Sequence, residues 1–362
     1  MKEAKKAVFF VSYDTLRNDL EEVEGVEFST LLLDEGQYIS NINAQKTHAV
    51  KEIKADTRFV LTGTPVQNSL MDLWSIFDFL LPGYFPPVNK FKELYGALDF
   101  AGEEAKARLM SKIKPFLLGR KKKDVLAELP DKELVTISLG MNHDQVKAYD
   151  AYLAKAREEL EQGSMRRMNL LAVMTRLRQI CITPGLFLEG DFSSAKIEYL
   201  LETLEDLKRS GRKAIIFSGF VSALDMIGKQ CKEAGINPEY ITGDTSAKVR
   251  VILAERFNRP DSNIDVMLVS LKAGGTGLNL IGADTVFHLD PWWNLAAERQ
   301  AEDRAHRIGQ TNKVTVFKLV MKNSIEEKML ALQARKGLLI DMTDEASLEG
   351  ALTEEDYKFL LS

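Results

Sequence analysis

The sequence predicts an α/β protein with two parallel-sheet lobes, one partial and one complete, and a helical insertion between them. The first observation is that short apolar, β-branched runs alternate with helical patterns in residues 191–340. The second is a set of similar runs in residues 1–85, and the third is a pair of long amphipathic stretches in residues 86–190. The chain of 362 residues is long enough for two or more domains, because a domain usually holds about 100–200 residues.

Residues 1–85 are expected to form the C-terminal part of the first lobe. Apolar runs predict three short buried strands, at residues 8–11, 31–33 and 59–61. The second and third of these runs lead straight into polar motifs. A helix that carries Leu73, Trp74 and Phe77 is expected to follow them.

Residues 86–190 are expected to form helical protrusions and a linker between the lobes. One helical stripe contains Val146, Tyr149, Leu153, Ala156 and Leu160, and residues 170–180 form a second one. Because this range carries apolar faces of its own, it is predicted to be an insertion rather than a flexible linker.

Residues 191–340 are predicted to form a complete second lobe. Strand-length apolar runs lie at residues 214–218, 239–242, 265–270, 285–289 and 314–320. Helical spacing joins Leu224, Ile227, Cys231 and Ala234 on one helix, and Val249, Leu253 and Phe257 on the next. This alternation favours a parallel sheet that is covered on both faces. The acidic tail, residues 341–362, is expected to be a loosely docked helix or a disordered segment.

The net charge of −5 is unevenly distributed along the chain. Residues 341–362 hold seven acidic side chains and one lysine, so the remaining residues are close to neutral. Basic clusters such as residues 120–123 and 166–167 are compatible with a solvated surface as well as with nucleic acid. Charge alone therefore does not establish DNA binding.

Other features of the composition bear on the compartment. The two cysteines lie far apart, which favours reduced thiols in a cytoplasmic, nucleoid-associated setting in a bacterium or a nuclear one in a eukaryote. No apolar run approaches the roughly 18 residues of a membrane span, so no membrane partner is expected. The basic and apolar N-terminus is too short for a secretion signal, and a strand is expected there instead.

An acidic motif follows the apolar run at residues 31–33. Asp34 and Glu35 are adjacent carboxylates, a pattern that suits a magnesium nucleotide. Asp34 would hold the metal through water, and Glu35 would orient or deprotonate the attacking water. Gln37 would be a polar relay or a loop residue. Acidic pairs at strand ends are common, so the motif alone is weak.

A second motif, Thr62-Gly63-Thr64-Pro65, follows the run at residues 59–61. Its hydroxyl groups suit a loop that contacts both the acidic motif and a neighbouring domain. The alternative is an ordinary turn between a strand and a helix, with Asn68 or Ser69 as the helix cap.

A glycine-rich loop follows the run at residues 265–270. Its glycines let backbone N–H groups approach a phosphate, and its hydroxyl groups add donors. In a translocase that phosphate would belong to the DNA backbone. The candidate DNA-binding residues are Ser270, Lys272, Gly274, Gly275, Thr276 and Gly277. The glycine spacing does not match a dinucleotide fingerprint.

Gln300, Arg304 and Arg307 are separated by four and three residues, so a helix would place all three on one face. Such a donor group suits an arginine finger that stabilises a transferring phosphoryl group. The alternative is a surface stripe of salt bridges. Trp292 is a candidate DNA-stacking residue, although packing between elements is the alternative. His306 is expected to be a structural hydrogen-bonding group.

The four histidines, His48, His143, His288 and His306, show no metal-ligand spacing. No structural zinc site is therefore expected.

In this order, the four motifs resemble the later motifs of the SWI/SNF-type (switch/sucrose-non-fermenting) DNA translocases of helicase superfamily two. The similarity is nearly continuous from Val8 to Lys336. It implies two RecA-like lobes with ATP and magnesium bound between them and duplex DNA lying across both. Nucleoprotein complexes or RNA polymerase are further partner classes that the resemblance implies.

The resemblance also implies roles for individual residues. Asp34 would serve magnesium and Glu35 the attacking water, while Thr62, Gly63 and Thr64 would couple hydrolysis to movement. Ser270, Gly275, Thr276 and Gly277 would contact DNA or the edge of the nucleotide. Arg304 and Arg307 would be the finger pair, supported by Gln300.

The sequence departs from the family pattern at several points. No Gly-x-x-x-x-Gly-Lys-Ser/Thr phosphate loop occurs, so we expect no ATP turnover by these residues alone. Gly119 stands where arginine is frequent, Gly219 where glutamine is usual, and Leu295 where proline is usual.

Three interpretations follow. The chain is the C-terminal portion of a translocase ATPase that lacks the N-terminal half of its first lobe, a non-enzymatic DNA- or partner-binding module, or one half of a split ATPase.

Overall fold

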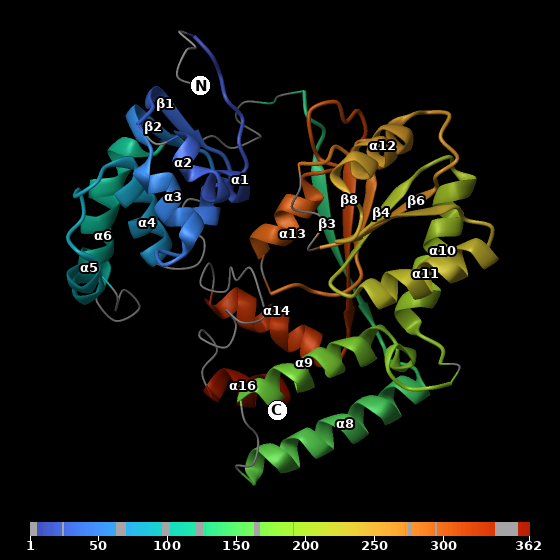
Figure 1. The fold of residues 1–362 in the computed structure, drawn as a ribbon. Helices are drawn as coiled ribbons and strands as arrows, with labels where there is room; N and C mark the ends of the chain where they lie inside the picture. Colours follow the sequence, from blue (N-terminus) through green and yellow to red (C-terminus); the bar gives the residue numbers. More distant parts are fainter. Residues whose placement is uncertain are drawn as a thin grey trace. The chain divides into compact units, whose positions relative to one another are not determined.

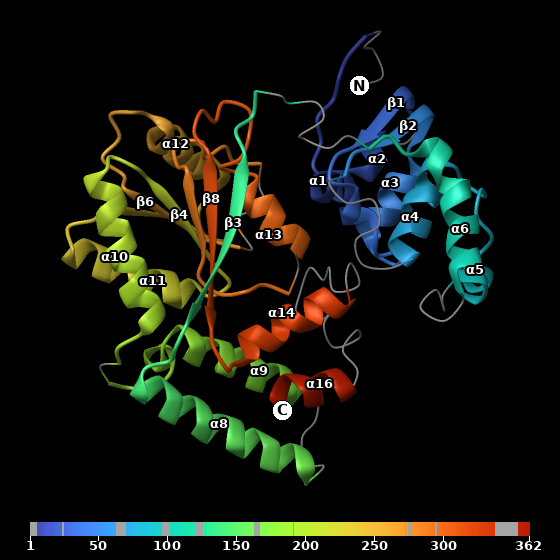
Figure 2. The ribbon, with the colours of Figure 1, turned by 180° about the vertical axis from the view of Figure 1, so that it is seen from behind.

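The computed structural model divides into two compact units, Met1–Gly119 (unit 1) and Arg120–Ser362 (unit 2). It describes residues 6–23, 25–62, 70–95, 102–119, 126, 128–162, 167–190, 192–271, 273, 277–293, 295–336 and 354–362. Figures 1 and 2 show the elements of each unit from opposite sides. Residues 86–190, for which the sequence predicts helical protrusions, contribute to both units, and the predicted domain limits remain predictions.

Unit 1 is built on two parallel strands, β1 (Glu27–Leu33) and β2 (Lys54–Val60), with Leu33 paired to Val60. The unit also contains a set of helices. They are α1 (Tyr13–Asn18), α2 (Leu20–Val23), η1 (Gly36–Ile39), α3 (Gln45–Glu52), α4 (Leu70–Leu80), α5 (Val88–Tyr95), α6 (Gly102–Ile113) and η2 (Lys114–Phe116). One core cluster joins the strands to α3 and α4, and an aromatic cluster joins α4, α5 and α6.

The first predicted strand of unit 1 is wrong. Residues 8–11 form no strand, and Phe10 is 95% exposed. The other two runs lie at the ends of β1 and β2, yet Leu32 and Phe59 are 52% and 51% exposed. The physical reason is that β1 and β2 pair only with each other among the described residues, so part of their apolar surface has nothing to pack against.

Unit 2 contains a six-stranded parallel sheet in the order β3-β8-β7-β4-β6-β5. Its strands are β3 (Lys132–Leu139), β4 (Ala214–Ser218), β5 (Pro238–Ile241), β6 (Val266–Ser270), β7 (Thr285–His288) and β8 (Val314–Met321). Every residue of β4, β6 and β7 is buried. All five strands predicted in residues 191–340 are confirmed, with ends within a residue or two.

Helices cover both faces of this sheet, as the sequence predicts (Figure 1). α12 (Ala247–Asn258) and α13 (Leu295–Glu302) pack on the face that presents Ile215 and Phe217. α10 (Ala195–Arg209) and α11 (Val221–Glu233) pack on the opposite face, which presents Ala214 and Ile216. Successive residues of a strand point to opposite faces, so β4 contributes to both clusters.

A helical layer adjoins the sheet. It consists of α8 (His143–Glu161), α9 (Arg167–Ile182), η3 (Pro184–Leu186), α14 (Ile325–Lys336) and α16 (Glu354–Leu361). Tyr357, Leu360 and Leu361 of α16 are buried in the core of this layer, so the last helix of the acidic tail is docked. Buried Cys181 lies in the same core, whereas buried Cys231, a residue of α11, lies in the core that α10 and α11 form with the sheet.

Two buried ion pairs join the helical layer to the sheet. Arg178 of α9 donates to Asp290, which follows β7, at 2.7 Å. Lys196 of α10 donates to Glu326 of α14 at 2.7 Å and to the carbonyl oxygen of Leu289 at 2.6 Å. Both pairs are almost completely buried, so loss of either partner would leave an uncompensated charge.

Candidate functional site

The acidic motif begins where β1 ends. Asp34 is exposed, and its Oδ1 accepts a hydrogen bond from the backbone N–H of Glu35 at 3.0 Å. Glu35 adopts a left-handed conformation with φ of 50°, which turns the chain directly into η1. Gly36 then lies so close to Val60 that an added Cβ would approach its Cγ1 to 2.2 Å. The close approach of this backbone to the end of β2 therefore favours glycine at this position.

A chain of hydrogen bonds connects the acidic motif to the second motif. The Nε2 of Gln37 donates to Glu35 at 2.7 Å, and its Oε1 accepts from the Thr62 hydroxyl at 3.1 Å. The predicted contact between a threonine hydroxyl and the acidic motif is thus present, with Gln37 as the relay. Gly63 and Thr64, the other two predicted coupling residues, lie outside the described residues.

The donor chemistry around Asp34 fits magnesium. The ion prefers oxygen ligands and keeps several waters, and an exposed carboxylate suits contact through water. Tyr13 lies beside the motif and donates to the Asp34 carbonyl oxygen at 2.8 Å. Burial together with the charges of Asp34 and Glu35 raises the pKa of Tyr13 above its ordinary value, so its hydroxyl stays a donor.

The glycine-rich loop starts at the end of β6. Ser270 is buried, and its hydroxyl accepts from the Ala273 N–H at 3.3 Å, so it shapes the loop from inside. Gly277 is exposed with φ of 43°, a conformation that favours glycine. The remaining predicted contacts, Lys272, Gly274, Gly275 and Thr276, lie outside the described residues.

Arg250 of α12 anchors the base of this loop, which sequence reasoning missed. Its guanidinium donates to the carbonyl oxygens of Thr245 at 2.7 Å, Thr242 at 2.9 Å and Ala273 at 3.5 Å. The planar fork of arginine suits several carbonyl acceptors at once. No local pattern identifies this role, because the acceptors come from two separate loops.

The predicted helix through Gln300, Arg304 and Arg307 is wrong in its extent. α13 ends at Glu302, so the three side chains do not share one helical face. Arg304 is buried, and its Nη1 donates to the Leu278 carbonyl oxygen at 3.3 Å. Arg307 is exposed and reaches the Gly277 carbonyl oxygen at 3.5 Å. Gln300 is partly buried. We call residues 295–311 the arginine segment.

Beyond the end of α13, distant donors take the carbonyl oxygens that a longer helix would use. The Leu280 N–H donates to the Arg304 oxygen at 3.0 Å. Buried Gln310 donates to the Ala305 oxygen at 3.2 Å and also to Ile281 and Ala283. These bonds replace the next turn of the helix and fasten the arginine segment to the chain that follows the glycine-rich loop. Gln310 closes the sequence motif, but the sequence does not reveal this role.

Trp292 is packed rather than open to solvent. Its ring is 8% exposed and lies in the core beside α12 and α13. The Arg178 guanidinium lies 5.4 Å from the ring centroid. A Cβ on Gly219 would approach Trp292 to 2.5 Å, so the glycine leaves room for this ring. In this conformation the geometry favours the packing interpretation, and DNA stacking by Trp292 stays a prediction.

His306 makes the structural contact expected from the sequence. One of its ring nitrogens, Nε2, lies 2.7 Å from the Pro130 carbonyl oxygen. Within the described ranges, no group of three or more His, Cys, Asp or Glu side chains is arranged to hold a metal ion.

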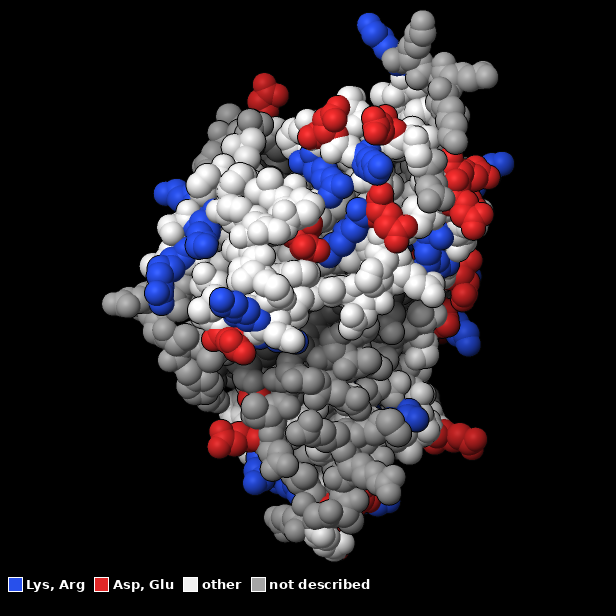
Figure 3. Space-filling model, turned by 60° about the vertical axis from the view of Figure 1, so that its left-hand side comes forward, with Lys and Arg blue, Asp and Glu red and all other residues white. Residues whose placement is uncertain are grey.

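The charge on the visible surface is mixed. In Figure 3, basic and acidic side chains alternate over the described residues of that face. A concentrated basic stripe, the usual electrostatic feature of a nucleic-acid surface, is absent from the described part of this view. None of the helices in the described ranges has both the length and the apolarity needed to cross a membrane.

The parallel sheet, the acidic motif and the arginine segment define an α/β protein with RecA-like architecture. Residues 1–186 match the family of the SNF2-related domain, and residues 195–309 match the helicase conserved C-terminal domain. The chain therefore belongs to the SNF2-related family of SWI/SNF-type proteins in helicase superfamily two.

Two curated relatives that match nearly the whole of this chain are much longer than it. An uncharacterized ATP-dependent helicase of Mycoplasma pneumoniae is 36% identical over 352 residues, which cover 96% of this chain and 34% of the relative. The human SWI/SNF-related matrix-associated actin-dependent regulator of chromatin subfamily A member 1 is 32% identical. The match covers 98% of this chain and 38% of that protein. The chain thus spans about a third of the length of these relatives.

Two solved structures of SWI2/SNF2 ATPase cores also match this chain. The Sulfolobus solfataricus SWI2/SNF2 ATPase core in complex with double-stranded DNA matches with a TM-score of 0.55 and 32% identity. The match covers 96% of this chain and 75% of that one. A second structure, described as the Sulfolobus solfataricus SWI2/SNF2 ATPase core domain, matches with a TM-score of 0.54 and 33% identity, and the match covers 96% of this chain and 73% of that one.

Proposed function

We propose that this chain is the C-terminal portion of an ATP-dependent translocase that moves along duplex DNA and remodels nucleoprotein complexes. The observation that carries the proposal is the attachment of Arg304 and Arg307 to the glycine-rich loop. Hydrogen bonds to Leu278 and Gly277 join the residues suited to a nucleotide phosphate to the loop suited to a DNA phosphate. Coupling of hydrolysis to movement needs a physical connection between the two ligand sites, and these hydrogen bonds would supply it.

The two arginines have different tasks in this proposal. Exposed Arg307 would be the finger that stabilises negative charge on the transferring phosphoryl group. Buried Arg304 would hold the loop, since its guanidinium is already directed at Leu278. Gln300 would support the pair from the preceding helix.

The acidic motif would prepare the attacking water. Glu35 would orient the water or accept its proton, and Gln37 would relay the state of Glu35 to Thr62 through the observed hydrogen bonds. Asp34 would hold magnesium through water, and the ion would neutralise charge on the phosphates. Gly63 and Thr64 would extend the same coupling path.

The phosphate loop would come from a segment outside these 362 residues. Two observations support this part of the proposal: the relatives are about three times longer, and β1 and β2 leave Leu32, Phe59 and Leu61 about half exposed. Such apolar surface on a sheet is normally covered by further strands or helices. The N-terminal half of the first lobe would provide that cover.

The test is a DNA-stimulated ATPase assay. The chain alone should show no turnover, whereas a protein that also contains the phosphate-loop segment should hydrolyse ATP at roughly one per second or faster. Glu35→Gln in that longer protein should abolish hydrolysis while ATP still binds. Several turnovers per second by the chain alone would contradict the proposal.

Arg307→Ala separates the finger assignment from DNA binding. Turnover should fall on the order of a thousandfold, with a smaller change in duplex affinity. Loss of DNA binding with turnover retained would show that Arg307 is a DNA contact instead.

A split ATPase is the second candidate, because unit 2 has a complete sheet and unit 1 does not. Mixing the chain with a separate phosphate-loop fragment tests it. Restored turnover would support the split arrangement, and no turnover would favour a single longer chain or a non-enzymatic binding module.

A further inference from the structure

The chain enters unit 2 through residues that lie directly against the arginine segment. We call residues 126–132 the entry segment, of which 127 is not described. Lys132 donates to the Glu302 carboxylate at 2.7 Å, and the Pro130 carbonyl oxygen lies 2.7 Å from His306 Nε2. Glu302 precedes Arg304 by two residues, and His306 immediately precedes Arg307. The two contacts therefore lie on either side of Arg304, and the second lies immediately before Arg307.

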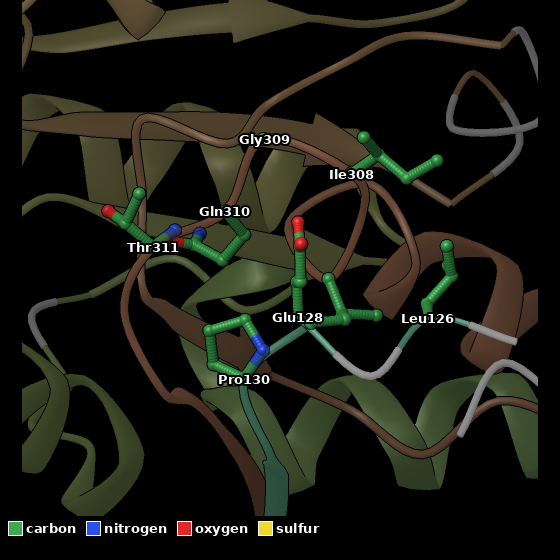
Figure 4. Close-up of a pocket in the computed structure, with 8 residues that line it drawn as sticks. Leu126, Glu128, Pro130, Ile308, Gly309, Gln310 and Thr311 are labelled. Atoms are coloured by element: carbon green, nitrogen blue, oxygen red, sulfur yellow. The ribbon is translucent and has the colours of Figure 1, made fainter. Parts of the chain in front are cut away.

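The two segments are not packed continuously against each other. Figure 4 shows Glu128 and Pro130 of the entry segment facing Gly309 and Gln310 across a pocket of about 450 Å³. A pocket of this size leaves many side-chain atoms without apolar partners. Beside this pocket, the polar contacts of Lys132 and His306 join the entry segment to the arginine segment.

The Glu302 carboxylate is held in its charged form. Its side chain is 4% exposed, and the His288 imidazole lies 3.5 Å away on the side of β7. Burial alone would raise the pKa of Glu302, but His288 and Lys132 outweigh that effect and lower the pKa to about 2. A buried carboxylate that stays ionised needs a cation beside it. Removal of Lys132 should therefore displace the Glu302 side chain from its present position.

A second lysine fixes the other end of α13. Glu298 accepts hydrogen bonds from Lys318 of β8 and, at 2.8 Å, from the Trp292 N–H. β8 and β3 are neighbouring strands of the sheet. The helix that leads into the arginines is thus fastened to β8 near its start and to β3 at its last residue. Only the second attachment involves the entry segment.

We propose that Lys132 and His306 are positioning residues that fix the location of Arg307 relative to the sheet. The proposal rests on the proposed function, in which Arg307 stabilises the phosphoryl group. Residues 120–125 connect unit 1 to the entry segment in the sequence. The contacts of Lys132 and His306 then connect the entry segment to the residues beside Arg307. A misplacement of about 1 Å is enough to slow a positioned reaction by up to a hundredfold.

The experiment measures kcat, KM for ATP and duplex affinity in the longer protein that contains the phosphate loop. Lys132→Ala should lower kcat about tenfold with KM and DNA affinity within about twofold, and Lys132→Arg should restore most of kcat. In an Arg307→Ala background, Lys132→Ala should cause no further loss, because the lysine acts through that arginine. If Lys132 only stabilised the fold, Lys132→Ala would lower kcat by the same factor in the wild-type and the Arg307→Ala backgrounds.

Two further variants complete the design. Lys313→Ala removes an exposed ion pair with Glu133, the residue next to Lys132, and should leave kcat unchanged. His306→Ala removes the second contact without exposing a buried charge, so it tests the inference if Lys132→Ala fails to fold.

The outcomes separate the two proposals. Wild-type kcat in Lys132→Ala and His306→Ala, or losses fully additive with Arg307→Ala, would overturn the positioning role alone. Wild-type kcat in Arg307→Ala would overturn the finger assignment and this inference with it.

Discussion

The two sheets of this protein differ in how far the chain itself completes them. In unit 2, helices cover both faces of a six-stranded sheet whose strands β4, β6 and β7 are buried throughout, and Leu268 in β6 is fully buried. In unit 1, the two described strands leave Leu32 of β1 half exposed. Both sheets are parallel and both end in a motif suited to phosphate chemistry. Unit 2 therefore encloses a core of its own, whereas the described strands of unit 1 leave part of their apolar surface exposed.

Lys196 provides the largest expected effect on unit 2. Lys196→Ala leaves Glu326 buried without its cation and should lower the free energy of unfolding by about 3–5 kcal/mol. Urea denaturation followed by circular dichroism measures this change. Lys313→Ala is the control, since its ion pair is more than half exposed on both sides and should contribute less than about 1 kcal/mol. Equal losses of unfolding free energy in both variants would mean that the Lys196–Glu326 pair is not shielded from water.

A matched pair of leucines compares the two sheets directly. Leu268→Ala should cost about 2–5 kcal/mol because it creates a cavity in a closed core. Leu32→Ala should cost less than about 1 kcal/mol in the chain alone, since half of its side chain is already exposed. Adding the phosphate-loop segment should raise the cost of Leu32→Ala. No such increase would argue that the exposed face of β1 and β2 is not where that segment packs.

The ion pair of Glu302 should make unit 2 sensitive to acid. The folded-state pKa of about 2 lies below the ordinary 4.5, so its stabilisation is complete above pH 4.5. That stabilisation is lost as the pH falls toward 2, and the pKa difference corresponds to at most about 3 kcal/mol. Glu302→Gln should therefore flatten the decline in stability between pH 4.5 and 2. An identical decline in the variant would place the acid sensitivity elsewhere.

Sequence reasoning succeeded where burial is complete and failed where partners are distant. The strands at residues 214–218 and 266–270 are buried throughout, which produces the apolar runs that the sequence displays. β3 was missed because it is an edge strand with alternating exposed residues inside a range that otherwise indicates helices. Residues 8–11 show the reverse error, since an apolar run indicates a need for burial but does not supply a partner.

The candidate site divides in the same way. The contact of Thr62 with the acidic motif follows from two strand ends that meet at one edge of a parallel sheet. The end of α13 and the ion pair of Lys132 with Glu302 depend on groups up to 170 residues apart, and no local pattern encodes them. Gln310 was visible in the motif, yet its three carbonyl partners were not.

The cysteines have a practical consequence for measuring motion. Cys181 and Cys231 are the two thiols of the chain, and both are fully buried with raised pKa values, so they should react slowly with labelling reagents. Cysteines introduced at exposed Asp14 and Lys313 would then be the reactive pair, one on each unit. Fluorescent dyes at these positions would report, in real time, how ATP and duplex DNA change the distance between the units.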